Sequence, residues 1–204
     1  MSEPRRVALT FDAEHPDRPN APPDAAERIL DALRERGVRA TFFVQSRWAM
    51  ANPDLARRIA DEGHLVGNHS TYHARPTLLS DEGLRADVAG AGETIATITG
   101  IEPRPWFRCP FGDGHDDPRV LAALAAAGYR NVHWHVEVQD WEPWHAPEEI
   151  AGASVAGAIG HGDGAVVLLH TWPGGTADAV PLALAALSDA GVSFVTVDEL
   201  EVLP

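Results

Sequence analysis

The sequence lacks several features that would assign it to common classes of protein. It has a single cysteine, Cys109, in 204 residues. It can therefore form neither an intrachain disulfide nor a zinc site made of four thiolates. Neither glycine-rich phosphate-binding pattern, GxGxxG or GxxxxGKS, occurs. Any bound metal must be held by histidine, aspartate or glutamate side chains.

Long apolar runs and positive charge are also scarce. No stretch approaches the ~18 apolar residues that a membrane-spanning helix needs, and the opening MSEPRR is followed by no apolar run that could act as a secretion signal. The sequence has sixteen basic and thirty acidic residues, for a net charge of −14. This charge repels phosphate backbones and anionic lipid surfaces. We therefore expect a cytoplasmic protein with neither nucleic acid nor membrane as a partner.

Apolar and amphipathic runs alternate along the whole chain without a low-complexity linker or an internal repeat, which predicts one domain over residues 1–204. Seven segments are predicted as strands: 5–13, 40–45, 64–70, 105–112, 130–138, 165–172 and 193–200. Six are predicted as helices: 24–37, 53–63, 79–100, 116–128, 147–160 and 176–191. Asp24, Ser80 and Asp117 are candidate N-caps. About seven strands, nearly all followed by a helix, indicate a parallel sheet in an α/β protein.

The polar residues that could take part in catalysis or metal binding follow the predicted strands at their carboxyl ends. They are Asp12 and Glu14, His69 and His73, Arg108, Glu137 and Asp140, and His170. In a closed parallel barrel these ends converge on one face, where the active sites of such folds are built. We therefore predict a single-domain distorted (β/α) barrel. The alternative is an open doubly wound sheet, which usually carries a glycine-rich phosphate turn after its first strand.

Two histidines four residues apart, together with a carboxylate from another strand, could supply the three protein ligands of a catalytic zinc site. The same ligands would also suit cobalt, nickel or iron. A second carboxylate could then act as general base, and the stretch TFDAEH offers both Asp12 and Glu14. The alternative is that His69 and His73 are hydrogen-bonded loop residues, that Asp12 caps a turn and that Glu14 is solvated.

His170 and Arg108 also allow two interpretations. His170 ends a strand apolar enough to be fully buried, so it is either a hydrogen-bonded core residue or a general acid oriented by Glu137 or Asp140. Arg108 could lie beside Asp12 and keep that carboxylate ionised, or the two could form a purely structural ion pair.

Together these stretches resemble the polysaccharide deacetylase family, carbohydrate esterases that remove acetyl groups from N-acetylated sugars. HSTYH looks like the family's HSxxH motif, and FRCPFGDG, EVQDW and VVLLHT are similar to its FRPPYG, DxxDW and LxH motifs. The match covers almost the whole chain in order, from LTFDAEH to VTVDEL. It implies a distorted (β/α) barrel with one divalent metal, usually zinc.

The resemblance also implies a role for each matching residue. His69 and His73 would be metal ligands, Asp12 the general base, Arg108 its electrostatic partner and His170 the general acid, tuned by Glu137 or Asp140. Trp141 and Leu168 would wall a slot for the acyl methyl, and the backbone N–H of Phe111 would help to hold the oxyanion.

Two departures from the family pattern affect this transfer. The common TFDDG pattern has a second aspartate as third ligand, and this chain has Ala13 there. A minority of the family uses a DxE spacing, so Glu14 inherits the role, with His15 as a substitute if Glu14 cannot reach. Cys109 replaces a proline, and we expect it to be a small buried residue.

We therefore expect metal-dependent hydrolysis of a non-peptide C–N amide bond, with an N-acetylated amino sugar or glycan as substrate. One alternative is an amidohydrolase of a small cyclic imide, ureide or formamide on the same scaffold, because a fold does not name a substrate. Another is a metal-free sugar-binding pseudoenzyme in which Trp106, Trp141, Trp144 or Trp172 stacks on sugar rings. The oligomeric state is not legible in the sequence.

Overall fold

The chain forms two compact units in the computed structural model, which describes residues 4–18, 21–201 and 203. Unit 1 contains Met1–Phe11, Arg18–Thr41 and Trp134–Pro204, and unit 2 contains Asp12–Asp17 and Phe42–His133. The prediction of one catalytic domain over 1–204 stays a prediction. Among the described residues, no helix combines the length and the apolar character needed to cross a bilayer.

The strands of both units are parallel wherever their register is defined. They are β1 (Arg6–Ala13), β2 (Thr41–Val44), β3 (Leu65–Asn68), β4 (Trp106–Phe107), β5 (Arg130–Asn131), β6 (Val136–Glu137), β7 (Ala165–His170) and β8 (Ser193–Phe194). Their order is β5-β4-β3-β2-β1-β7-β6, with β8 paired to β1. This confirms the predicted fold class, an α/β protein of the (β/α) barrel type, although the described residues form eight strands and not about seven.

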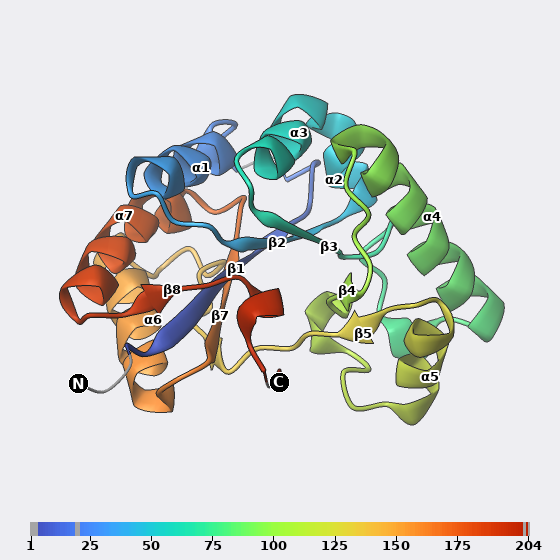
Figure 1. Cartoon of the computed structure of the whole chain (residues 1–204). Coiled ribbons are helices and arrows are strands. Elements are labelled where there is room, and N and C mark those ends of the chain that lie inside the picture. Colours follow the sequence, from blue (N-terminus) through green and yellow to red (C-terminus); the bar gives the residue numbers. More distant parts are fainter. Residues whose placement is uncertain (1–3, 19–20, 202, 204) are drawn as a thin grey trace. The chain divides into compact units, whose positions relative to one another are not determined.

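Helices follow most of the strands, as the alternating pattern predicts (Figure 1). They are α1 (Ala25–Glu35), α2 (Ser46–Ala51), α3 (Pro53–Asp61), α4 (Asp81–Thr99), α5 (Pro118–Ala126), α6 (Pro147–His161) and α7 (Gly174–Asp189). Ser80 caps α4 by accepting from the Gly83 N–H, and Asp117 caps α5. Asp24 occupies the N-cap position of α1 without a side-chain cap bond.

Unit 1 is organised around the buried strands β1 and β7. The Thr10 hydroxyl of β1 donates to the Val167 carbonyl of β7 at 2.7 Å, and β6 pairs with β7 so that Glu137 lies opposite Leu168. Helices α6 and α7 lie side by side, and α1 packs against α7 (Figure 1). β7 ends at His170, so this packing fixes the point from which His170 leaves the sheet.

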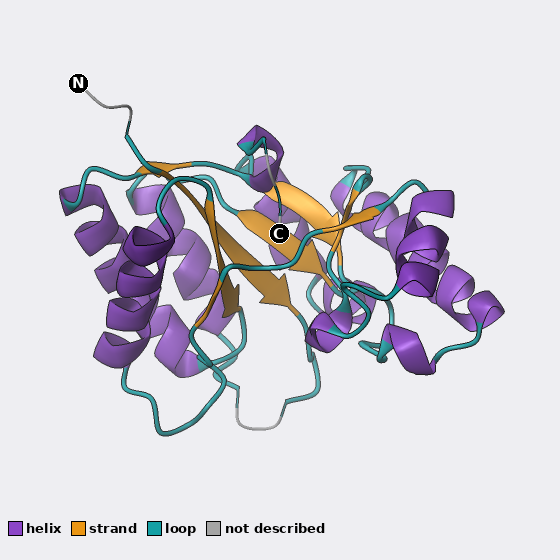
Figure 2. Cartoon of the chain, turned by 90° about the horizontal axis from the view of Figure 1, so that it is seen from below, coloured by secondary structure: helices purple, strands orange, loops and turns teal. Residues whose placement is uncertain are grey.

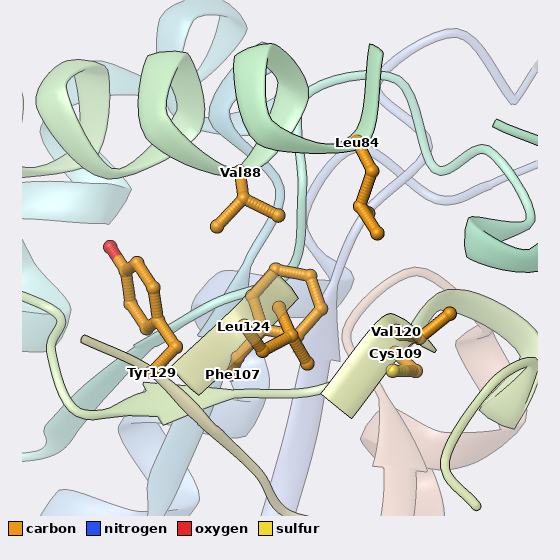
Figure 3. Packing of buried hydrophobic residues seen from close by; sticks show 7 residues of the cluster. All are labelled: Leu84, Val88, Phe107, Cys109, Val120, Leu124 and Tyr129. Atoms are coloured by element: carbon orange, nitrogen blue, oxygen red, sulfur yellow. The ribbon is translucent and has the colours of Figure 1, made fainter. Parts of the chain in front are cut away.

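Unit 2 has an apolar cluster between helices α4 and α5 and strand β4. Leu84 and Val88 of α4 face Val120 and Leu124 of α5, and the rings of Phe107 and Tyr129 fill the space between them (Figure 3). The Cys109 thiol belongs to the same cluster, as predicted for a small buried residue. The cluster anchors α4 and β4, the elements beside the segments that carry His69 and Arg108.

Three predicted strands are much shorter than expected, and loops or short helical turns take their place (Figure 2). In 105–112 only Trp106–Phe107 pairs, because prolines on both sides cannot donate to a ladder. The run 130–138 splits into β5, which pairs with β4, and β6, which pairs with β7. In 193–200 only Ser193–Phe194 pairs, and a 3₁₀ turn at Val197–Glu199 follows. Helix α2 has no counterpart among the predicted elements.

Two glycines of α4 provide a matched test of the packing in unit 2. A Cβ added at Gly92 would lie 2.3 Å from the hydroxyl of Tyr129, which is buried in the cluster, whereas one added at Gly90 would meet no atom within 4 Å. We expect Gly92→Ala to lower the free energy of unfolding by about 1–3 kcal/mol through overpacking. Gly90→Ala should raise it by about 0.5–1 kcal/mol, since alanine restricts the unfolded chain more than glycine does.

Urea unfolding of both variants beside the native chain measures these two free energies. Equal effects of the two substitutions would contradict the described contact between Gly92 and Tyr129.

Candidate active site

Glu14 and His15 form a turn directly after β1, and Gln45 holds this turn in place. The Gln45 N–H donates to the Ala13 carbonyl at 2.9 Å, and the Gln45 side-chain oxygen accepts from the His15 N–H at 3.0 Å. His15 has a φ of 55°, which few non-glycine residues adopt. The turn sends the carboxylate of Glu14 inward, where the residue is 3% exposed.

The HSTYH segment is a second tightly held turn, after β3. Ser70 and His73 have positive φ values of 68° and 55°. The Asn68 side-chain oxygen accepts from the Ser70 N–H, and the Ser70 hydroxyl accepts from the His73 N–H. Asp87 of α4 accepts from the N–H groups of Thr71 and Tyr72. Helix α4 therefore holds the segment that presents both histidines.

Glu14, His69 and His73 converge on one point in unit 2. One Glu14 carboxylate oxygen, Oε2, lies 3.2 Å from Nε2 of His69 and also contacts Nε2 of His73. The other oxygen, Oε1, lies 3.0 Å from Nε2 of His15. The three groups offer ligand atoms within 4.8 Å of one another, and in the described part of the chain they form the one such cluster of metal-ligating side chains. Glu14 thus lies where the predicted third ligand is needed, the role for which His15 was the predicted substitute.

The tautomer of His69 supports a cation at this point. Nδ1 of His69 lies 2.9 Å from the Arg108 carbonyl, which can only accept, so Nδ1 must carry a hydrogen. Nε2 then faces oxygens of both Glu14 and Asp12, at 3.2 and 3.5 Å. Because Nε2 faces two carboxylates, a positive charge is needed at this point, and either a proton on Nε2 or a metal ion supplies it.

The electrostatics of the two imidazoles differ. Burial opposes a charge on His69, but Asp12 and Glu14 together outweigh it and raise the pKa of His69 above its ordinary value. Burial lowers the pKa of His73, and Nδ1 of His73 has no hydrogen-bond partner among the described residues. Two imidazoles and one carboxylate are the donor set of a catalytic zinc site, so these residues fit a divalent metal.

Asp12 and Arg108 form a buried ion pair beside this group. Nη1 of Arg108 donates to Oδ1 of Asp12 at 2.9 Å, and both side chains are at least 95% buried. The other nitrogens of the guanidinium donate to the carbonyls of Val132 and His133 at 3.1 Å, and its face lies over the Phe43 ring. These contacts fix Oδ1 of Asp12 and leave Oδ2 on the side of His69.

Phe111 lies at the edge of the same group. Its φ is 59°, the residue is 53% exposed, and the ring centroid lies 4.3 Å from that of His73. The Arg75 guanidinium covers the ring at 4.4 Å from the centroid. Unit 2 therefore brings together six of the predicted site residues: Asp12, Glu14, His69, His73, Arg108 and Phe111.

Unit 1 holds the second cluster, built around His170 at the end of β7. Oδ1 of Asp140 lies 2.8 Å from Nδ1 of His170, and Oδ2 accepts from the His170 N–H and from the Thr176 hydroxyl. The Trp141 ring meets the imidazole edge-on at 5.2 Å between centroids. A carboxylate on Nδ1 leaves Nε2 of His170 as the nitrogen that can exchange a proton with a substrate.

The structure distinguishes between Asp140 and Glu137, the two acids that were candidate partners of His170 in the sequence. Asp140 is 2% exposed and bonds His170, whereas Glu137 is exposed on β6. Leu168, the predicted wall of the acyl slot, is buried in β7 opposite Glu137 in the ladder. The prediction that Trp106 offers a face to a sugar is wrong, because Trp106 is 7% exposed and packs within β4 under Arg130.

The interpretation of the sequence missed the residues that orient the predicted ones. Asp87, Gln45, Asn68 and Thr176 are buried and hold segments that carry site residues. A signal existed for Asp87, which lies three residues after Leu84 in the apolar stripe of the predicted helix. An acid in a buried stripe needs partners, and here they are the backbone N–H groups of the HSTYH segment.

The comparisons with known proteins agree with the fold. The family model for polysaccharide deacetylase matches residues 2–132, well over half of the chain. The chitooligosaccharide deacetylase of Rhizobium leguminosarum bv. trifolii is 37% identical over 169 residues, which cover 83% of this chain and 73% of that protein. This chain belongs to the polysaccharide deacetylase family.

Two solved structures are similar over nearly the whole chain. A family 4 carbohydrate esterase from Streptomyces lividans, in complex with acetate, has a TM-score of 0.80 and 32% identity, covering 93% of this chain and 91% of that one. A pseudoenzyme of the same CE4 family from Bacillus anthracis has a TM-score of 0.84 and 26% identity, covering 97% and 65%. Family membership therefore does not by itself establish activity.

Removal of the Asp87 carboxylate should loosen the HSTYH segment. In Asp87→Ala, the N–H groups of Thr71 and Tyr72 lose their acceptor, so we expect the free energy of unfolding to fall by about 1–3 kcal/mol. Zinc affinity should fall by about 10- to 100-fold, as it does when residues that orient ligands are removed. Asp87→Asn keeps an oxygen acceptor, and it should bind zinc within a few-fold of the native chain.

Calorimetric zinc titration of the chelator-treated proteins measures these affinities. Unchanged zinc binding in Asp87→Ala would show that α4 does not position the ligands.

Burial should make Cys109 unreactive. Burial, reinforced by the nearby charge of Asp113, raises the pKa of the Cys109 thiol to about 12. At pH 8 the thiolate fraction is then on the order of 10³ times smaller than for an ordinary cysteine. We expect iodoacetamide to label the native protein more slowly than the urea-unfolded protein by at least that factor, as mass spectrometry would record. Comparable rates in the two states would show that the thiol is accessible.

Proposed function

We propose that this protein is a metal-dependent hydrolase that removes the acetyl group from an N-acetylated amino sugar or glycan. The convergence of Glu14, His69 and His73 carries the proposal, because it supplies a complete set of ligand atoms despite Ala13. Membership of the polysaccharide deacetylase family supports the reaction class, and the similar chitooligosaccharide deacetylase supports the substrate class.

Glu14, His69 and His73 would hold one divalent cation, with zinc the best match to the donor set and cobalt, nickel or iron also suitable. Such an ion lowers the pKa of a water to about 7 and polarises an acyl oxygen, so that hydrolysis can proceed at neutral pH. The bond between His69 Nδ1 and the Arg108 carbonyl keeps the Nε2 lone pair directed at the cation.

Asp12 would be the general base that takes the proton of the attacking water. Arg108 occupies Oδ1, so Oδ2 is the oxygen available to accept the proton. The buried setting strengthens this ion pair, because few water molecules compete with the guanidinium. The backbone N–H of Phe111 would donate to the developing oxyanion.

His170 would protonate the departing nitrogen, which leaves as the free amine while the acetyl group leaves as acetate. Asp140 holds Nδ1 and stabilises the imidazolium, so the proton is delivered from Nε2. Trp141 and Leu168 would enclose the acetyl methyl.

The two rival functions rest on weaker support. Nothing in the donor set separates an acetylated sugar from a small cyclic imide, ureide or formamide, so the substrate must be tested directly. A metal-free sugar-binding role was suggested by Ala13 and gains a precedent in the similar CE4 pseudoenzyme. The contacts of Glu14 with both histidines weigh against it, because they replace the ligand that Ala13 cannot supply.

The function is tested by acetate release from N-acetylated chitooligosaccharides. We expect about one bound metal per chain, loss of activity with a chelator and recovery with zinc. His69→Ala should lose both metal and activity, whereas Asp12→Asn and His170→Asn should keep the fold and lose kcat by about 10²- to 10⁴-fold. The control is His161→Gln, because His161 is exposed at the end of α6 and has no role in the proposal.

The outcomes separate the rivals. Ring opening of imides without acetate release would favour the small-amide hydrolase, and a metal content near zero would favour the pseudoenzyme. Full activity of His69→Ala would contradict the metal-dependent mechanism.

A further inference from the structure

Phe111 has a backbone conformation that its own burial does not explain. Its φ of 59° lies in the left-handed region, which bulky side chains rarely adopt, and the residue is 53% exposed. A half-exposed ring gains too little from burial to enforce such a conformation, which persists only where surrounding contacts hold it. The contacts of the Phe111 ring therefore decide how firmly this residue is placed.

The turn that contains Phe111 leaves the N–H of this residue available as a donor. The next two N–H groups of the chain are used within the turn. Gly112 donates to the Cys109 carbonyl at 2.9 Å, and Asp113 donates to the Pro110 carbonyl at 3.0 Å. The N–H of Phe111 donates to no acceptor among the described residues. The direction of this N–H, the proposed oxyanion donor, thus depends on how the Phe111 ring is held.

The Phe111 ring contacts one proposed metal ligand and one arginine. Its centroid lies 4.3 Å from that of the His73 imidazole, with 60° between the ring planes. The guanidinium carbon of Arg75 lies over the same ring, 4.4 Å from the centroid. A cation over an aromatic face is attracted by the quadrupole of the ring. Arg75 therefore restrains the ring that contacts His73.

The segment that carries Arg75 is itself bonded to the turn of Phe111. Oδ2 of Asp113, two residues after Phe111, accepts from both the N–H and the hydroxyl of Thr77, at 2.9 and 2.7 Å. Arg119 of α5 donates to the Thr77 carbonyl at 3.1 Å and holds the same segment from its other side of the chain. Arg75 thus projects from a backbone whose position is fixed relative to the ring that it covers.

We propose that Arg75 is a positioning residue, which acts through the Phe111 ring to keep the backbone N–H of Phe111 directed at the developing oxyanion. The inference rests on the proposed deacetylase function for the role of that N–H, whereas the contact itself requires neither metal nor substrate. Removal of the guanidinium frees the ring, and the strained turn then adopts conformations in which the N–H points elsewhere. The interaction lost is one made in the transition state, so kcat falls while KM changes little.

Steady-state acetate release from N-acetylated chitooligosaccharides tests the kinetic part of the proposal. We expect Arg75→Ala to lower kcat by about three- to tenfold, which corresponds to the loss of a partly exposed cation–π contact. Arg75→Lys keeps a cation that can reach the ring, and it should retain most of the activity. In a Phe111→Ala background, Arg75→Ala should have no further effect, because the ring through which Arg75 acts is already gone.

An NMR measurement on the metal-free protein tests the contact apart from the chemistry. The ring current of Phe111 shifts the imidazole signals of His73, which labelled histidine makes visible. We expect these signals to move in Arg75→Ala toward their positions in Phe111→Ala, and to stay near their native positions in Arg75→Lys. The matched control is Arg130→Ala, because the Arg130 guanidinium also covers an aromatic ring of unit 2, that of Trp106, at 4.2 Å. It should change neither the His73 signals nor kcat.

Native kcat in Arg75→Ala would overturn the proposal, whether or not the His73 signals move. A loss of kcat without movement of these signals, or an equal loss in the native and Phe111→Ala backgrounds, would overturn it as well, because Arg75 would then not act through the ring. Failure of the deacetylase function gives a different pattern. In that case Arg75→Ala moves the His73 signals, which upholds the contact, but the native protein releases no acetate from any substrate.

Discussion

The organisation of the proposed metal ligands and base depends on one fully buried arginine, Arg108. The side chain of Arg108 holds Asp12, and its backbone carbonyl accepts from His69, so a single residue orients both the proposed base and one proposed ligand. The guanidinium also satisfies two carbonyls of the segment after β5. Removing one partner of such a pair leaves an uncompensated buried charge, which costs several kcal/mol. The pair therefore specifies the geometry of unit 2 more than it contributes net stability.

Backbone strain is concentrated in the segments that carry the site. Among the described residues, the non-glycine positions with positive φ are His15, Ser70, His73, Phe111 and Gln139. Each belongs to, or directly adjoins, a segment with a proposed ligand, base, oxyanion donor or orienting acid. Such conformations cost about 1–3 kcal/mol each and persist when surrounding contacts enforce them. At the turn of His15 and in the HSTYH segment, Gln45, Asn68 and Asp87 supply those contacts, so the fold fixes these two turns in conformations that they would not adopt alone.

The sequence predicted best the parts whose local signal agrees with their tertiary context. The strand that ends at Ala13 and the helix capped by Ser80 have strong periodicity, and the structure has both. The prediction of one strand over 130–138 failed because the apolar residues of this run do not reveal that its two ends pair with different strands. At the site, chain position alone could not choose between Glu137 and Asp140, which are three residues apart. Only the exposed position of Glu137 and the buried contact of Asp140 decide this.

The position of Glu14 has a consequence for how members of this family are sorted. Ala13 is fully buried at the last position of β1, whereas Glu14 leaves the strand and reaches both imidazoles through a longer side chain. The bend after the strand, and not a pair of adjacent acidic residues, therefore determines where the oxygen donor lies. A search pattern that demands neighbouring aspartates would miss this chain, although its Glu14 carboxylate contacts both imidazoles.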